Sequence, residues 1–268
     1  MINKTILSGL ICFALFASAF LISGQSSIYF NATAFLVVVS GTVGATFMSS
    51  GIQRVIRAFQ AGAISYQEDP ARVRRLVDML MSLGHLHRRH GIVNPDSVPD
   101  EFPMAASGLE IVKDGYSEEE IKDVMLSEAR SMYLSRQELE NVFRNMATYA
   151  PSFGVAGSVI GLVGLLMGMD DTGMILKSIP ITLVSTLYGI VLSNFLFLPV
   201  AEKMKQETQA QVRELEMILC AMVCMRKEVD FLRMQRMLNA MISDPELRVE
   251  DSGAFRRISS KLKTEPTT

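Results

Sequence analysis

The chain has 268 residues, of which 49% are hydrophobic and 20% charged, and its formal net charge is −2. This composition favours a membrane protein with a modest soluble part over a soluble protein. The near-neutral charge excludes the strong field typical of nucleic-acid-binding proteins. The cysteines, Cys12, Cys220 and Cys224, indicate no disulfide framework.

The N-terminal part of the chain divides into two apolar segments. No charged residue occurs from Thr5 to Gln53, and a polar break at residues 23–31 interrupts this stretch. About 20 apolar residues cross a bilayer core as a helix. The sequence therefore predicts one transmembrane helix over roughly Thr5–Ile22 and a second over roughly Ala32–Gly51.

The first apolar segment has an alternative interpretation. Lys4, the apolar run after it and the small residues Ala17-Ser18-Ala19 also fit a cleaved signal peptide. Cleavage would leave an odd number of transmembrane helices.

The middle segment, residues 52–145, is predicted to be a helical domain. Residues 73–91 place apolar side chains on one helical face, and Gly91 is a typical stop. Prolines predict a loop over residues 94–103. The sequence is mostly basic over residues 54–89 and mostly acidic over residues 96–123. This pattern indicates either two solvated surfaces that attract each other or a docking face for a protein partner.

A further helix is predicted to begin at Ser117, which forms a capping box with Glu120. No helix breaker follows until Pro151. We therefore expect one helix to continue into the third apolar segment, because its backbone amides then stay satisfied in the membrane.

Residues 149–201 are predicted to form a transmembrane hairpin. No charge occurs between Arg144 and Asp170 or between Lys177 and Glu202, and a short polar turn joins the two apolar stretches. Helices in lipid associate through small residues that allow close backbone contact. The third segment has such residues at helical spacing, namely Gly154, Gly157, Gly161, Gly164 and Gly168. The fourth segment has Ser178, Thr182, Ser185, Gly189 and Ser193.

The C-terminal part, residues 202–268, is predicted to begin as a long helix and to end as a flexible tail from Asp244. The helix carries an apolar stripe for packing against a neighbour, formed by Leu215, Ile218, Met222, Met225, Val229 and Leu232.

Orientation follows from the basic residues that flank the apolar segments. They are Arg54, Arg57, Arg136, Arg144, Lys203 and Lys205, whereas the turn between the first two segments has no charge. Both termini and the middle segment are therefore expected in the cytoplasm. The expected division is residues 1–51 and 146–201 in the membrane, and residues 52–145 and 202–268 in the cytoplasm.

No nucleotide-binding loop, nucleophile elbow or catalytic carboxylate pair indicates an enzyme. His85, His87 and His90 resemble metal ligands in spacing, but two arginines lie between them and disfavour a cation. The four apolar segments contain no Asp, Glu, Lys, Arg or His, which are the usual marks of proton and ion paths. They offer only hydroxyls and carbonyls, so a carboxylate for ion transport would come from a partner.

The hairpin resembles the MotA family of flagellar stator proteins, which includes the sodium-driven PomA proteins. The family's third-segment pattern stands at Ala150–Gly154 and Gly157–Leu162, and its fourth-segment pattern at Leu183–Lys203. The second-segment pattern G-T-x-G-A-T stands at Gly41–Thr46.

This resemblance implies an all-α, polytopic inner-membrane protein with four transmembrane helices, a helical cytoplasmic domain and no cofactor. Family members form a pentameric ring around a dimer of a single-span partner, MotB or PomB, which carries the ion-binding Asp. Flow of protons or sodium ions turns the ring, which pushes on the rotor protein FliG.

The resemblance also implies roles for individual residues. Pro151 and Pro199 match prolines of the third and fourth segments, of which the first couples ion binding to conformational change. Ser158, Ser185 and Thr186 match hydroxyl positions beside the ion path, where the family has Thr at the first two.

Arg88 and Arg89 match the basic pair that meets the rotor. Asp96 falls on the acidic rotor contact, where the family usually has Glu. Two other functions stay open: a TolQ/ExbB-like energiser of another envelope process, and a passive membrane scaffold.

Overall fold

The computed structural model describes residues 4–22, 29–67, 69, 71–91, 94–167 and 172–242. Helices and their connecting turns make up these ranges, and no strand occurs in them. The chain divides into two compact units. Unit 1 comprises Met1–Glu68 and Ser135–Glu207, and unit 2 comprises Asp69–Leu134 and Thr208–Thr268.

The elements follow one another with short connections. In chain order they are α1 (Lys4–Ile22), α2 (Ala32–Ser50), α3 (Ile52–Ile64), α4 (Arg72–His90), the 3-10 turn η2 (Pro95–Ser97), α5 (Pro103–Lys113), α6 (Glu118–Met167), α7 (Thr172–Val191), the π-helical turn η3 (Leu192–Phe197), α8 (Leu198–Arg226) and α9 (Phe231–Met241).

Three helical stretches of the described chain are long and apolar enough to cross a membrane. They are Ala32–Ser50, Glu118–Met167 and Ser178–Arg226, the last of which joins α7, η3 and α8. In α1 the apolar stretch is the shorter Leu7–Ser18. The helix predicted over Thr5–Ile22 is present, and its crossing of the membrane stays a prediction.

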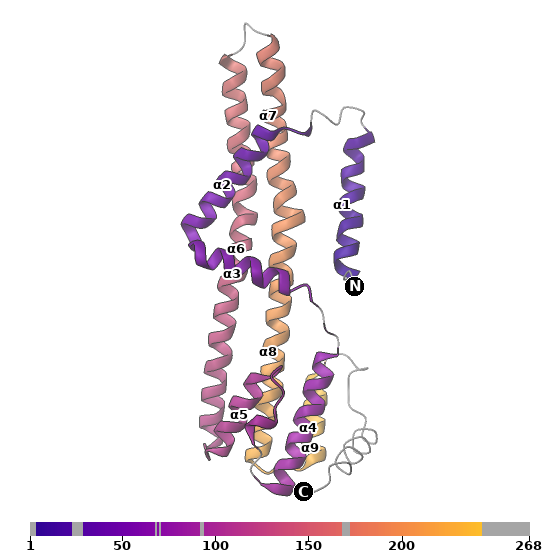
Figure 1. Cartoon of the computed structure of the whole chain (residues 1–268), viewed down its shortest axis with the longest axis vertical. Coiled ribbons are helices and arrows are strands. Elements are labelled where there is room, and N and C mark those ends of the chain that lie inside the picture. The colour runs from indigo at the N-terminus through magenta and orange to yellow at the C-terminus, as the bar shows by residue number, and fades with distance from the viewer. Residues whose placement is uncertain are drawn as a thin grey trace. The chain divides into compact units, whose positions relative to one another are not determined.

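Unit 1 contains the pair of helices α6 and α7, which run side by side in Figure 1. A Cβ atom added at Gly154 would lie 2.9 Å from the Ser185 carbonyl oxygen, and one at Gly189 would lie 3.0 Å from the Pro151 Cα. Since these neighbours are backbone atoms, no side-chain rotation relieves the clash. Small residues therefore set the spacing of the two helices.

The same close contact continues along the pair. An added Cβ at Gly157 would meet the Ser185 side chain at 2.7 Å, and one at Gly164 would meet the Ser178 hydroxyl at 3.0 Å. Gly168, the last glycine of the predicted face, lies outside the described residues.

Helix α2 packs against α7 through Tyr188. The Tyr188 hydroxyl donates to the Tyr29 carbonyl at 2.5 Å and accepts from the Asn31 amide at 3.1 Å. The Phe35 ring meets the Tyr188 ring edge-on at 5.8 Å. The Asn31 side chain also caps α2 by accepting from the Ala34 amide. The start of α2 is therefore held both by its own cap and by the Tyr188 hydroxyl.

Gly51 ends α2 and turns the chain sharply into α3 (Figure 1). Its φ of 76° lies in the left-handed region that favours glycine. Helix α3 buries Val55 and Ala58 in a cluster that includes Phe143 and Met146 of α6. Its opposite side stays exposed.

Unit 2 has a separate apolar core made by α4, α5, the beginning of α6, the end of α8 and α9. The face predicted for residues 73–91 lies in it, and α4 ends before Gly91 as predicted. The capping box at the start of α6 is confirmed, since the Ser117 amide donates to Glu120 Oε2 at 2.8 Å and Ser117 Oγ accepts from the Glu120 amide at 3.3 Å.

Two predictions for this unit were incomplete or wrong. The predicted loop over residues 94–103 contains the turn η2 and leads into α5, which was not predicted. The continuous C-terminal stripe is wrong beyond Met225, because α8 ends at Arg226 and the chain reverses through Glu228, whose φ is 51°. Leu232 therefore lies on α9 and is 52% exposed.

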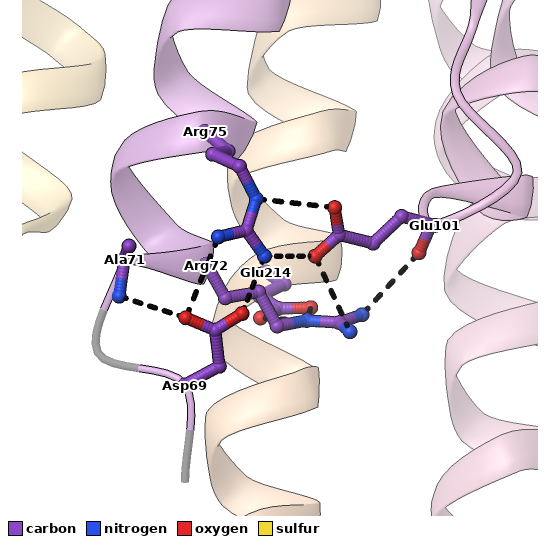
Figure 2. A network of polar contacts seen from close by, with 6 residues as sticks. All are labelled: Asp69, Ala71, Arg72, Arg75, Glu101 and Glu214. Atoms are coloured by element: carbon purple, nitrogen blue, oxygen red, sulfur yellow. Dashed lines mark hydrogen bonds and ion pairs between the residues drawn. The ribbon is translucent and has the colours of Figure 1, made fainter.

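An ionic network joins α4 to the turn before α5 and to α8 (Figure 2). Arg72 Nε lies 2.8 Å from the nearly buried Glu214 carboxylate. Arg75 Nη2 lies 2.5 Å from both Asp69 Oδ2 and Glu101 Oε1. The basic and acidic parts of the middle segment thus attract each other, as one of the two interpretations predicted.

Replacement of Gly161 by alanine should destabilise the protein, because the new Cβ would lie 2.6 Å from the Thr182 amide nitrogen and 2.8 Å from its Cα. We expect a loss of about 1–3 kcal/mol, typical of overpacking. Gly44→Ala is the matched control, since its Cβ would meet nothing within 4 Å. Thermal unfolding of the detergent-purified protein measures both, and equal stability of the two variants would contradict the packing argument.

Replacement of Arg75 by glutamine should destabilise unit 2 at neutral pH and have less effect in acid. Hydrogen bonds from Arg75 hold the pKa of Asp69 and of Glu101 below their ordinary values. Their contribution is therefore present above the unfolded-state pKa of about 4 and is lost as pH falls through the lower folded-state values.

Unfolding of the wild type and of the Arg75→Gln variant, followed by circular dichroism across this pH range, tests the network. The two curves should converge in acid. Arg74→Gln is the control, because the exposed Arg74 makes no ion pair with the described residues. A constant difference between wild type and Arg75→Gln at every pH would rule out the assigned cause.

Candidate ion path and partner contacts

The three hydroxyl residues predicted for the ion path lie in one cluster between α6 and α7. Ser158 Oγ is 2.6 Å from Thr186 Oγ1 and 3.3 Å from Ser185 Oγ. Ser158 also donates to the Thr182 carbonyl at 2.6 Å. Helical spacing places Ser185 and Thr186 opposite Ser158, and the neighbouring glycines let the two backbones approach closely enough for these bonds.

The chemistry of this cluster is that of neutral oxygen ligands. A hydroxyl has one hydrogen and two lone pairs, so Ser158 can donate to the Thr182 carbonyl and still accept from Thr186. Thr186 Oγ1 also lies 3.3 Å from the Gly154 carbonyl oxygen. The oxygens can contact a dehydrated cation or order water molecules. They do not titrate in the physiological range, so the cluster alone stores no proton.

Pro151 lies inside α6 without ending it. Proline has no amide hydrogen, so the carbonyl four residues earlier, that of Ala147, loses its usual donor. The buried Ser193 supplies one, because its Oγ donates to the Ala147 carbonyl oxygen at 2.6 Å. A side chain from the fourth segment thus completes the backbone hydrogen bonding of the third.

Pro199 lies at the beginning of α8, directly after the π-helical turn η3. Turns of this kind occur where the helical hydrogen-bond ladder is locally rearranged, frequently at functional sites. Within η3 the Asn194 side chain donates to the Ile190 carbonyl at 2.9 Å. The two prolines of the resemblance therefore accompany two different interruptions of the regular ladder.

Ser193 and Tyr188 are polar residues whose contacts the sequence analysis missed. A signal for Ser193 was available, because a proline within a membrane helix leaves a carbonyl that needs a donor from elsewhere. Tyr188 carried no such signal, since its partner is a backbone carbonyl in a different segment.

The residues predicted to contact the rotor lie at the surface of unit 2. Arg88 forms an exposed ion pair with Asp230 at 2.8 Å, and Arg89 is exposed beside it. Asp96 is exposed in η2, where the Asn94 side chain donates to its Oδ2 at 3.1 Å. Both arginines lie in the last turn of α4, whereas Asp96 lies in the following 3-10 turn η2.

A comparison with family models matches residues 98–217 to the MotA/TolQ/ExbB proton channel family. Motility protein A of Bacillus subtilis is 30% identical over 224 residues, which are 81% of this chain and 82% of that protein. The B. subtilis protein YtxD, described as uncharacterized, is 31% identical over 193 residues, 71% of each chain.

The fold also matches a solved structure, described as the flagellar MotAB stator complex from Bacillus subtilis. The TM-score is 0.81 with 26% sequence identity, and the match covers 93% of this chain and 100% of the other. Together with the relatives, this match agrees with the patterns in the second, third and fourth apolar segments. The chain belongs to the MotA family, within the wider MotA/TolQ/ExbB proton channel family.

Proposed function

We propose that this chain is a ring-forming stator subunit of the bacterial flagellar motor, which couples proton or sodium flow across the inner membrane to torque on the rotor. The observation that carries the proposal is the hydroxyl cluster of Ser158, Ser185 and Thr186, which lies between two apolar stretches that contain no Asp, Glu, Lys, Arg or His. Hydroxyl oxygens between two membrane helices suit an ion path. A passive membrane scaffold, the alternative function, would need only the glycine contacts.

The missing carboxylate supports a second chain in the ion path. Intramembrane ion sites normally contain an ionisable residue, and here it would come from a single-span partner similar to MotB or PomB. The similar B. subtilis structure is described as a MotAB complex, which supports this partner. We further propose a pentameric ring, four transmembrane helices with α1 as the first, and both termini in the cytoplasm.

The rotor contact is proposed for Arg88, Arg89 and Asp96, with FliG as the protein that they meet. Their exposure supports this role, since charged groups on a protein surface can pair with another chain without loss of a core contact. Arg88 would first leave Asp230. An exposed ion pair contributes only about 0–1 kcal/mol, so this exchange costs little.

The combined change Ser158→Ala and Thr186→Val should impair ion-driven motility. Each change removes an oxygen from the cluster that would contact the ion or its water, so we expect swimming speed to fall severalfold. The measurement is swimming of a stator-deficient host that expresses this chain with its genomic neighbour. Ser152→Ala is the matched control, because Ser152 Oγ bonds only to Thr148 of its own helix among the described contacts.

Replacing sodium by potassium in the same assay identifies the ion, since only a sodium-driven protein stops. Normal swimming of the double variant, at a normal protein level in the membrane, would refute the ion-path assignment. A neighbouring gene that encodes a TolR-like partner without a peptidoglycan-binding domain would favour a TolQ/ExbB-like energiser instead.

A further inference from the structure

A cavity of about 520 Å³ lies at the elbow between α2 and α3, apart from the hydroxyl cluster. Its lining includes Ser50, Gly51, Arg54 and Arg57 on one side and Ser135 and Glu138 of α6 on the other. The sharp turn at Gly51 creates this space, because α3 leaves the direction of α2 while α6 continues past it (Figure 1). The ion path proposed above makes no use of the cavity.

The charges around the cavity favour an anion. Arg54 Nη2 lies 3.3 Å from Glu138 Oε2, and Arg54 Nη1 lies 3.4 Å from the Ser50 carbonyl oxygen. Arg57 is exposed and makes no ion pair with the residues that the structure describes. Two cations and one carboxylate leave a surplus positive charge. A phosphate is suited to it, since guanidinium groups bind phosphate oxygens in pairs.

Exposed apolar side chains occur on both helices of the elbow, and one of them, Ile52, lines the cavity. Met48 is 91% exposed in the last turn of α2, and Ile52 is 62% exposed at the start of α3. Ile56 lies one turn after Ile52 on α3 and is 52% exposed. A ligand that fills the cavity and also covers these side chains must have an anionic end and an apolar body.

The place of the cavity along the chain identifies such a ligand. Helix α2 is long and apolar enough to cross the membrane, and the cavity lies at its C-terminal end. Lipid headgroups meet the ends of transmembrane helices, and arginines there attract anionic lipids. Inorganic phosphate carries the same anionic group but has nothing to cover Met48 and Ile52.

We propose that this cavity binds the headgroup phosphate of an anionic glycerophospholipid, with Arg57 and Arg54 on the phosphate and the acyl chains along Met48 and Ile52. Glu138 competes with the phosphate for Arg54 and so weakens binding. The proposal rests on the membrane placement of α2 and is independent of the motor function.

Native mass spectrometry of the detergent-purified protein, with or without its partner, tests the site. The probe is an equimolar mixture of phosphatidylglycerol and phosphatidylcholine. Wild-type protein should retain phosphatidylglycerol preferentially. Arg54→Gln and Arg57→Gln should each lower that retention by about fivefold, with retention of phosphatidylcholine unchanged. Glu138→Gln should raise it, which a merely destabilised variant would not do.

Arg236→Gln serves as the control, because Arg236 is an exposed arginine of α9 outside the cavity. It should retain both lipids as the wild type does. Equal retention of the two lipids by the wild type, or undiminished retention of phosphatidylglycerol by both Arg54→Gln and Arg57→Gln, would overturn the proposal. Release of the lipid by excess inorganic phosphate would likewise overturn it, in favour of a simple phosphate site.

Swimming assays separate this proposal from the motor function. If the hydroxyl variants lose ion-driven swimming but retain lipid normally, the result bears on the ion path and leaves the lipid site unaffected. If the protein drives swimming but shows no lipid selectivity, the lipid site is refuted and the motor function is unaffected.

Discussion

Hydrogen bonding of the backbone inside the membrane is the constraint on which unit 1 depends. A hydrocarbon environment supplies no water to an unpaired carbonyl or amide, so each must find a partner within the protein. The hairpin meets this demand with neutral groups alone. Glycines bring α6 and α7 together, and the hydroxyls of the facing helix then reach carbonyls that a larger residue would keep apart.

The same close approach concentrates oxygen atoms in the interface between α6 and α7. Carbonyls of Gly154 and Thr182 lie beside the hydroxyls of Ser158 and Thr186. The arrangement that satisfies the backbone therefore also produces a polar strip through an apolar layer. In the proposed ion path, the atoms that stabilise the helix pair are the same atoms that would contact the ion.

Unit 2 is stabilised by different forces, because its charges can be hydrated. Its helices bury a core of leucine and methionine side chains, and arginines of α4 bind carboxylates from the turn before α5 and from α8. Leu76 and Leu80 of α4 are fully buried, whereas the arginines that flank them stay at the surface. The alternation in the sequence between apolar and charged residues thus separates the core from the ionic network.

The sequence predicted the features that depend on neighbouring residues. The Ser117–Glu120 cap, the stop at Gly91 and the extent of α2 follow from local spacing. It did not predict the chain reversal at Glu228, because that residue adopts a left-handed conformation that its side chain does not favour. The helical spacing of apolar residues continues across this turn, so the sequence alone suggested that the helix continued too.

Contacts between distant segments were predictable only where composition demanded them. The glycine and serine spacing predicted the α6–α7 seam, but no periodic pattern indicated that Tyr188 holds the start of α2. The roles proposed for Arg88 and Asp96 depend on the surface of another protein, which the sequence of this chain does not describe. Those roles came from the resemblance to the MotA family and not from the spacing or chemistry of neighbouring residues.

The bond between Ser193 and the Ala147 carbonyl has a mechanical consequence. A backbone amide is fixed by its own helix, whereas a serine hydroxyl turns about a single bond. The carbonyl beside Pro151 therefore has a donor that can be withdrawn without unwinding either helix. Starting a bend of α6 at this point costs roughly one hydrogen bond, about 1 kcal/mol. Because the donor belongs to the segment that contains η3, a bend of α6 and a movement of that segment would occur together.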